Sequence, residues 1–192
     1  MSSSLTTQTI FIIIGGFTML VVNLFGAPGA GKSTGAAYVF SKLKMAGVNA
    51  ELVTEFAKDK VWEESKAVFQ NQAYIFGKQY FRISRLQDKV DVVITDSPLL
   101  LSCFYCDDET LGDEFNALVS KVFDSYNSMN VFINRVKPYN PTGRFQNEQE
   151  SDALSQDLIP FLNKFGVACR HYDGCEESYD ILVADILDAL KR

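Results

Sequence analysis

The chain has 192 residues, of which 47% are hydrophobic and 22% charged, and its formal net charge is −6. This length predicts one globular domain with a single core. The negative charge argues against a general attraction to nucleic acid or to an anionic membrane, so any polyanion would have to be held by a local basic patch. The four cysteines are too few and too scattered for a disulfide framework, which indicates reduced thiols in a cytoplasmic compartment.

Residues 1–18 differ from the rest of the chain. The apolar runs at 10–14 and 17–25 are separated by two glycines, and residues 1–9 carry no charge, whereas a signal peptide needs basic residues at its start. We therefore expect no membrane anchor. Residues 1–18 are predicted to be an extension of a domain over 19–192, or the product of an upstream start. An additional strand over residues 10–14 is the alternative.

A phosphate-loop motif follows the first predicted strand. Residues 26–34 match the G-x-x-x-x-G-K-[ST] pattern (Walker A), with an apolar strand before them and a helix predicted over 34–45 after them. The glycines allow the backbone amides to turn toward a phosphate, Lys32 supplies a positive charge, and the Ser33 hydroxyl is a ligand for Mg²⁺. We therefore predict that ATP and Mg²⁺ bind here. The predicted nucleotide-binding residues are Gly26, Ala27, Pro28, Gly29, Ala30, Gly31, Lys32, Ser33 and Thr34.

Short apolar strands then alternate with amphipathic helices, which is the pattern of a parallel sheet covered on both faces. The predicted strands are 20–25, 50–54, 90–95, 130–134 and 167–172. The predicted helices are 34–45, 62–86, 113–127, 147–165 and 178–190. Crossovers between parallel strands are right-handed. The sequence therefore predicts an α/β fold of the P-loop NTPase class, a three-layer sandwich with a mostly five-stranded parallel sheet and a short lid.

Two acidic residues are expected at the carboxyl ends of the strands, where ligands bind in such sheets. Asp96 follows a strand that is apolar on both faces, the usual place for an acid that holds Mg²⁺ through water. We predict that Ser33 and Asp96 form the metal site. Glu55 follows the second strand and is the candidate that accepts the proton of an alcohol, with Asp59 and Glu51 as alternatives. Cys103 and Cys106 form C-x-x-C, but zinc would need two more ligands, so we expect no metal cluster.

Residues 135–146 contain three cations, two prolines and one glycine. Such a segment cannot pack a core of its own, and we predict that it is a lid that covers the transferring phosphoryl group and excludes water. Arg135 and Arg144 are the expected phosphate contacts, because a guanidinium can hold two phosphate oxygens at once. A lid favours a small kinase over an ATPase that remodels a partner.

Several segments resemble a group of bacteriophage P-loop kinases that are related to the thymidylate kinase family and include 5-hydroxymethyl-deoxyuridine DNA kinases. The resemblance lies in residues 51–59, 61–63, 96–100 and 143–146, and extends from about residue 19 to 172. The segments 74–82 and 92–97, with Ser102 and Tyr105, are similar to the thymidylate and deoxynucleoside kinases. Asp96 is followed by Ser97 and Pro98 where thymidylate kinases typically have an arginine, which argues against an ordinary monophosphate site.

The resemblance implies ATP-dependent phosphorylation of the 5-hydroxymethyl group of 5-hydroxymethyluracil in phage DNA, a step of thymidine hypermodification in the host cytoplasm. This acceptor requires a pocket for a flipped pyrimidine, amide groups that read it and cations for the flanking backbone. The helix over 70–85 is the candidate, with core packing of its aromatic residues as the alternative. Its predicted substrate residues are Gln72, Phe76 and Gln79 on one face, and Lys78 and Arg82 on another.

Two other functions fit the same residues. One is a kinase of free (deoxy)nucleosides or nucleoside monophosphates, which the small size and the acidic charge suit. The other is a P-loop ATPase or switch that acts on a protein partner. The general base, the choice between ATP and GTP and the oligomeric state stay open at this level.

Overall fold

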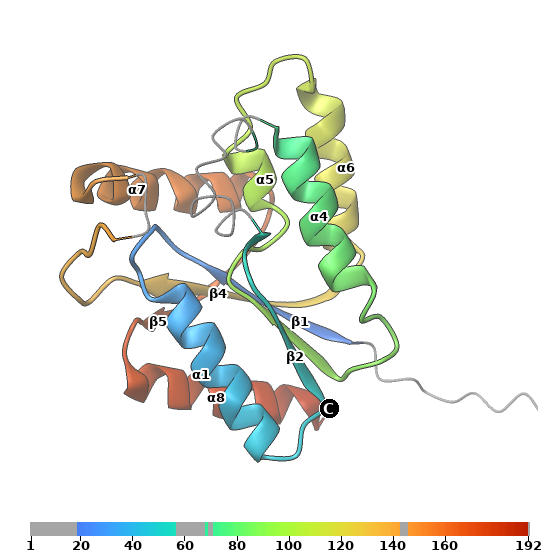
Figure 1. Ribbon diagram of the computed structural model, residues 1–192, viewed down its shortest axis with the longest axis vertical. Helices are drawn as coiled ribbons and strands as arrows, with labels where there is room; N and C mark the ends of the chain where they lie inside the picture. Colours follow the sequence, from blue (N-terminus) through green and yellow to red (C-terminus); the bar gives the residue numbers. More distant parts are fainter. Residues whose placement is uncertain (1–18, 57–67, 69–70, 143–145, 192) are drawn as a thin grey trace, which may run out of the picture.

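The computed structural model describes residues 19–56, 68, 71–142 and 146–191. The elements, labelled as in Figure 1, are β1 (Leu20–Phe25), α1 (Lys32–Met45), β2 (Ala50–Val53), α4 (Gln72–Ser84), β3 (Val92–Thr95), α5 (Leu101–Phe104), α6 (Gly112–Asp124), β4 (Asn127–Asn134), α7 (Glu148–Lys164), β5 (Arg170–Asp173) and α8 (Glu176–Leu190). The expected extension 1–18, Asp59 and Arg144 lie outside the described residues.

The five strands form one sheet in the order β2-β3-β1-β4-β5, and every neighbouring pair is parallel. All six residues of β1 are buried, because this central strand is covered by helices on both faces. In the register, Asn23 lies opposite Thr95 of β3 and Asn130 of β4. This architecture confirms the predicted P-loop sandwich and places the loop after β1 between the ends of β3 and β4.

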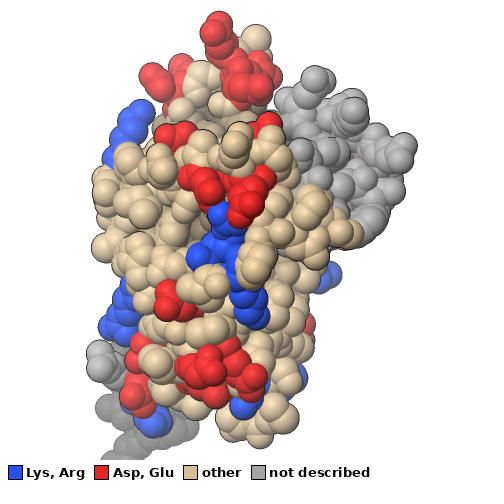
Figure 2. Space-filling model, turned by 90° about the vertical axis from the view of Figure 1, so that its left-hand side faces the viewer, with Lys and Arg blue, Asp and Glu red and all other residues tan. Residues whose placement is uncertain are grey.

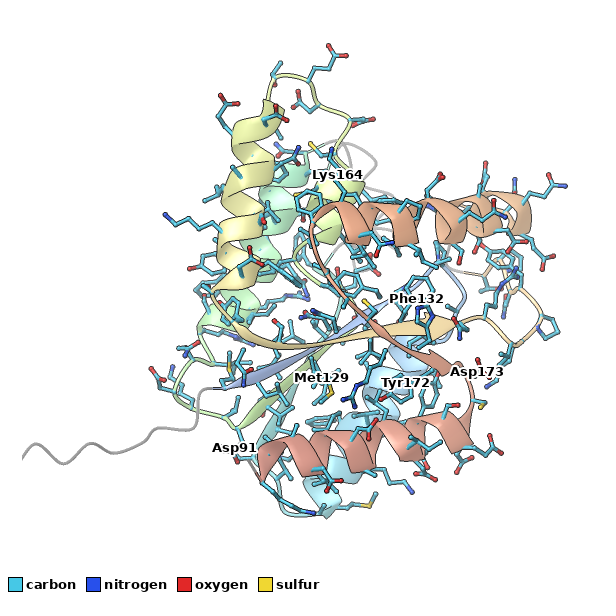
Figure 3. The ribbon with its side chains drawn as sticks, turned by 180° about the vertical axis from the view of Figure 1, so that it is seen from behind. Asp91, Met129, Phe132, Lys164, Tyr172 and Asp173 are labelled. Carbon is cyan, nitrogen blue, oxygen red and sulfur yellow. The ribbon has the colours of Figure 1, made fainter. Side chains whose placement is uncertain are left out.

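Helices cover the sheet on both faces. Figure 1 shows α1 and α8 on one face and α4, α5, α6 and α7 on the other. Alternate residues of β1 enter the two cores: Val22 and Leu24 pack with α1 and α8, while Val21 and Phe25 pack with the opposite layer. In Figure 3, Phe132 of β4 lies toward α7, whereas Tyr172 of β5 lies toward α8.

Some predicted bounds are wrong. The helix expected over 113–127 ends at Asp124, and β4 begins at Asn127 rather than at 130. Pairing with β1 starts at Leu20 opposite Asn127, so tertiary pairing recruits a polar stretch that has no strand periodicity of its own. β5 begins at Arg170 rather than at 167. It is the last strand in the order and pairs with β4.

The expected continuous helix 62–86 is also wrong at Asn71, which is the N-cap of α4 and accepts a hydrogen bond from the Tyr74 amide at 2.9 Å. The predicted start of α7 is confirmed: Asn147 and Glu150 form both hydrogen bonds of a capping box. Among the described residues, no helix combines the length and the apolar character needed to cross a bilayer.

Candidate functional site

The phosphate loop connects β1 to α1 through a backbone that glycine permits. Gly31 is the N-cap of α1 and has φ 106°, and a Cβ there would lie 2.6 Å from the Tyr179 hydroxyl oxygen. Gly26 has φ 140°, and a Cβ there would lie 2.7 Å from the Ile133 carbonyl oxygen. A side chain at either position would therefore add both backbone strain and a collision. The motif glycines are required by the local packing as well as by the turn.

A Gly31→Ala variant tests this requirement. It should lower the free energy of unfolding by about 1–2 kcal/mol, because a non-glycine residue at positive φ is strained, and it should also lose ATP binding as the loop shifts away from Tyr179. Gly47→Ala is the control for the strain alone, since Gly47 has φ 83° and a Cβ there would meet nothing within 4 Å. It should lose a similar stability and leave ATP binding unchanged. Chemical denaturation and calorimetry would measure both. ATP binding by Gly31→Ala at the strength of the unmodified protein would contradict the prediction.

The start of α1 favours an anion. The amides of a first helical turn have no acceptor within the helix, and the helix dipole is positive there. No acidic residue occupies the first turn of α1, and the side chains of Ser33 and Thr34 are exposed. Lys32 folds back over the loop, where its Nζ donates to the carbonyl oxygens of Gly26 at 2.7 Å and Ala27 at 3.1 Å. The loop thus presents amides, a hydroxyl and an ammonium group together.

Asp96 lies next to this loop, because β3 pairs directly with β1. Its side chain is only 3% exposed, and its Oδ1 accepts a hydrogen bond from the Glu55 amide at 2.9 Å. A buried carboxylate held in this way, beside the strand that leads into the Ser33 loop, offers the oxygen ligands that Mg²⁺ prefers, with waters completing the shell. The Asp96 carboxylate and the Ser33 hydroxyl are of the oxygen type that Mg²⁺ binds, and the metal site stays a prediction.

Glu55 follows β2, so it lies at the carboxyl ends of the strands, as Asp96 does. Tyr105 follows α5, and burial together with the negative charge of Glu55 raises the pKa of its hydroxyl to about 12. Tyr105 therefore stays protonated over the physiological range and can donate a hydrogen bond. The sequence interpretation assigned no role to Tyr105, because the influence of Glu55 on it depends on how the chain turns after Asp96.

The predicted substrate residues of α4 divide by face. Gln72, Phe76 and Gln79 are buried. Phe76 stacks with Tyr80 and meets the edge of Phe115, with ring centroids 5.9 Å apart in each pair, so it belongs to the core. For Phe76 the structure therefore agrees with the alternative expectation, in which the aromatic residues of this helix pack in the core. A role for this face in acceptor binding stays a prediction.

Gln79 connects α4 to the strand ends. Its Oε1 accepts from the Phe56 amide and its Nε2 donates to Thr95 Oγ1, both at 3.2 Å. Because both polar ends bind protein groups, the side chain is placed to support the loops after β2 and β3. It holds in position the segments that carry Glu55 and Asp96.

Replacing Gln79 with methionine should lower the free energy of unfolding by about 1–3 kcal/mol, because the substitution removes two buried hydrogen bonds, one from the Phe56 amide and one to Thr95 Oγ1. Gln87→Met, at an exposed position just beyond α4, is the control. Urea denaturation of the two variants measures the difference. Equal stabilities would show that the Gln79 hydrogen bonds contribute nothing.

The cations of α4 lie nearer the surface. Arg82 donates from Nη1 to the Thr54 carbonyl oxygen at 3.0 Å and lies over the Phe56 ring at 5.2 Å. Lys78 is exposed and lies 5.4 Å from the Tyr74 ring centre. Arg82, like Gln79, is therefore brought by its contacts to the carboxyl end of β2.

Arg135 leaves β4 toward α7. Its Nη1 donates to Glu148 Oε1 at 2.7 Å, its Nη2 pairs with Asp152, and its guanidinium lies 5.5 Å from the Tyr139 ring centre. Figure 2 shows the side of the molecule where the strands end: basic side chains gather near its centre, with acidic side chains above and below them. Arg135 is thus held at the strand end in an ion pair with α7.

Two contacts of the phosphate loop were missed by sequence reasoning. Ser151 of α7 donates from Oγ to the Pro28 carbonyl oxygen at 2.7 Å, and the Tyr179 hydroxyl of α8 donates to the Gly31 carbonyl oxygen at 3.0 Å. Both residues are more than 120 positions from their partners in the chain, so no local pattern could have indicated them.

A family model described as an AAA domain matches residues 21–174, a range that contains the phosphate loop, Glu55, Asp96 and the expected lid. The chain belongs to this AAA domain family. A comparison with curated proteins finds no match.

Two solved structures share the fold. The structure of deoxyadenosine kinase from M. mycoides with bound dATP is 18% identical, covers 90% of this chain and 100% of its own, and has a TM-score of 0.53. Shikimate kinase from Acinetobacter baumannii in complex with shikimate is 14% identical, with 92% of this chain and 95% of that chain covered and a TM-score of 0.52. At these identities the likeness shows a P-loop kinase-like fold.

Proposed function

We propose that this protein is an ATP- and Mg²⁺-dependent kinase that phosphorylates an alcohol. The observation that carries the proposal is the arrangement around Asp96. The phosphate loop with Lys32 and Ser33 lies beside this buried carboxylate, and the Asp96 Oδ1 binds the amide of Glu55. A loop suited to the terminal phosphate and a carboxylate suited to the acceptor therefore both lie at the carboxyl ends of the parallel strands. The likeness in fold to two kinases supports the same conclusion.

Each group has a distinct task in this reaction. The loop amides and Lys32 hold the β- and γ-phosphates, while Ser33 and Asp96 hold the metal site, the latter through water. Bound Mg²⁺ neutralises the charge on these phosphates. The acceptor oxygen forms a bond to the γ-phosphorus as the bond to the bridging oxygen of ADP breaks. The proton of the alcohol passes to the carboxylate of Glu55.

Arg135 and Arg144 are proposed to neutralise the transferring phosphoryl group. Arg135 starts from its ion pair with Glu148 and Asp152. We propose that it exchanges one of these carboxylates for phosphate oxygens, so that its charge stays compensated. The lid role of residues 135–146 rests on this exchange.

The acceptor we propose is 5-hydroxymethyluracil in DNA, as the resemblance to the phage kinases implies, with the reaction in the cytoplasm of the host cell. The outer surface of α4 supports it. This helix contains no acidic residue, and Lys78 and Arg82 follow one another by one turn, next to the exposed rings of Tyr74 and Phe81. Cations and exposed rings together suit a nucleic-acid strand.

A free nucleoside or nucleotide is the second candidate, and the net charge of −6 favours it, because an acidic protein has weak general affinity for DNA. Incubation with γ-labelled ATP and one of three acceptors separates the candidates. The acceptors are DNA that contains 5-hydroxymethyluracil, the corresponding free nucleoside, and thymidine monophosphate. Label on DNA alone supports the first candidate, and label on a small acceptor supports the second. Phosphate release that needs no acceptor would contradict both and indicate an ATPase or switch.

A further inference from the structure

The phosphate loop is held by hydroxyl groups from both helical layers. Ser151 of α7 binds the Pro28 carbonyl, and Tyr179 of α8 binds the Gly31 carbonyl. We propose that these two hydroxyls are positioning groups that orient the loop amides toward the triphosphate. The inference rests on the proposed function, because it assigns Ser151 and Tyr179 to the phosphate site of that reaction.

Peptide geometry makes the link between these carbonyls and the bound phosphate. In a trans peptide the C=O and N–H bonds of one planar unit point in opposite directions. A hydroxyl that holds the Pro28 oxygen outward therefore directs the Gly29 amide inward. The Gly31 oxygen accepts two hydrogen bonds, one from the Gly35 amide at 2.8 Å as the first of α1 and one from the Tyr179 hydroxyl, and together they direct the Lys32 amide inward. An anion site whose amides are already oriented loses less free energy to ordering when the anion binds.

Ser151 is suited to this task. Its side chain has no exposed surface, and its hydroxyl reaches the loop at 2.7 Å. Its neighbours on α7, Glu148 and Asp152, bind Arg135 from the same part of the helix. Residues three and four apart lie on one helix face. The first turns of α7 therefore contact both the phosphate loop, through Ser151, and the cation proposed to act on the phosphoryl group, through Glu148 and Asp152.

Tyr179 provides the second hold from the opposite layer (Figure 1). Its side chain is 2% exposed, and its ring packs so closely on Gly35 that a Cβ there would lie 2.6 Å from the ring carbon Cε1. Gly174, just before α8, is equally close: a Cβ there would lie 2.3 Å from the Ala30 carbonyl oxygen. The start of α8 is thus fitted against the loop, and the hydroxyl of Tyr179 is aimed at one carbonyl.

The variants Ser151→Ala and Tyr179→Phe each remove one hydroxyl. The matched controls are Ser155→Ala, one turn further along α7, and Tyr126→Phe, which removes a phenol hydroxyl beyond α6. Calorimetry would measure the affinity for Mg·ATP and for magnesium tripolyphosphate, which lacks base and sugar. The temperature would be well below the measured Tm of every variant, so that a loss of stability cannot alter the result.

Each test variant should bind both ligands about three- to tenfold more weakly, the range expected for one hydrogen bond. The loss should be the same for the two ligands, and the controls should match the unmodified protein. Two results would overturn the inference: unchanged affinities in the folded variants, or a loss for ATP without a loss for tripolyphosphate. The unmodified protein is measured first, because failure to bind either ligand would instead overturn the proposed function.

Discussion

Replacing Lys32 with alanine is expected to lower the rate of phosphoryl transfer by about a hundredfold to a thousandfold, the loss typical when one charged or hydrogen-bonding group is removed from a transition state. The Nζ of Lys32 also binds the Gly26 and Ala27 carbonyls, so the variant loses two contacts that shape the loop. The measurement is initial rate with labelled ATP and the acceptor that the protein uses. Affinity for Mg·ATP should fall as well, since the same ammonium group serves both ground state and transition state.

Lys44→Ala is the control for Lys32. Lys44 lies on the same helix, is exposed and belongs to the last turn of α1, remote from the phosphate loop. Its removal should leave the rate unchanged. A Lys32→Ala protein that is folded and transfers phosphate at the normal rate would rule out the site described above.

The Asp96→Asn variant should need about 10–100-fold more Mg²⁺ for half-maximal activity, which is the usual cost of losing a group that orients a metal site. The substitution removes the negative charge but keeps an oxygen that can accept the Glu55 amide. The fold should therefore survive while the metal site weakens. A titration of activity against Mg²⁺ concentration, at saturating ATP, gives the result directly.

Asp91→Asn is the matched control, because Asp91 precedes the same strand at its amino end and is exposed (Figure 3). It accepts a hydrogen bond from the Asn49 amide, remote from the phosphate loop. Its Mg²⁺ dependence should equal that of the unmodified protein. If Asp96→Asn behaved in the same way as this control, Asp96 would have no role in holding the metal.

The parts of the site that the sequence predicted are local in the chain. The phosphate loop is nine consecutive residues between a strand and a helix, and Asp96 follows a short apolar run that predicts a buried strand. Both patterns are short, and the residues that form each structure are the same residues that form the pattern. The fold followed from the same kind of signal, because continuous apolar runs and helical periodicity alternate along the chain.

The parts that the sequence did not predict depend on distant pairing. The hydrogen bond from Ser151 to Pro28 joins residues 123 positions apart. The ion pairs of Arg135 with Glu148 and Asp152 form because of the direction that α7 takes after the lid segment. Gln79 has the spacing of a helix-face residue, but its burial against Thr95 follows from how α4 crosses the strand ends. The early start of β4 is set by its neighbour β1.

The strand order also places the two parts of the proposed site on strands that differ in local stability. The loop for the triphosphate extends from β1, the middle strand, whereas Glu55 follows β2, which lies at the edge of the sheet. Local opening costs less free energy at the poorly packed margins of a fold than in its central strands. If Glu55 acts on the acceptor as proposed, the acceptor part of the site lies where local opening costs less than at the loop that follows β1.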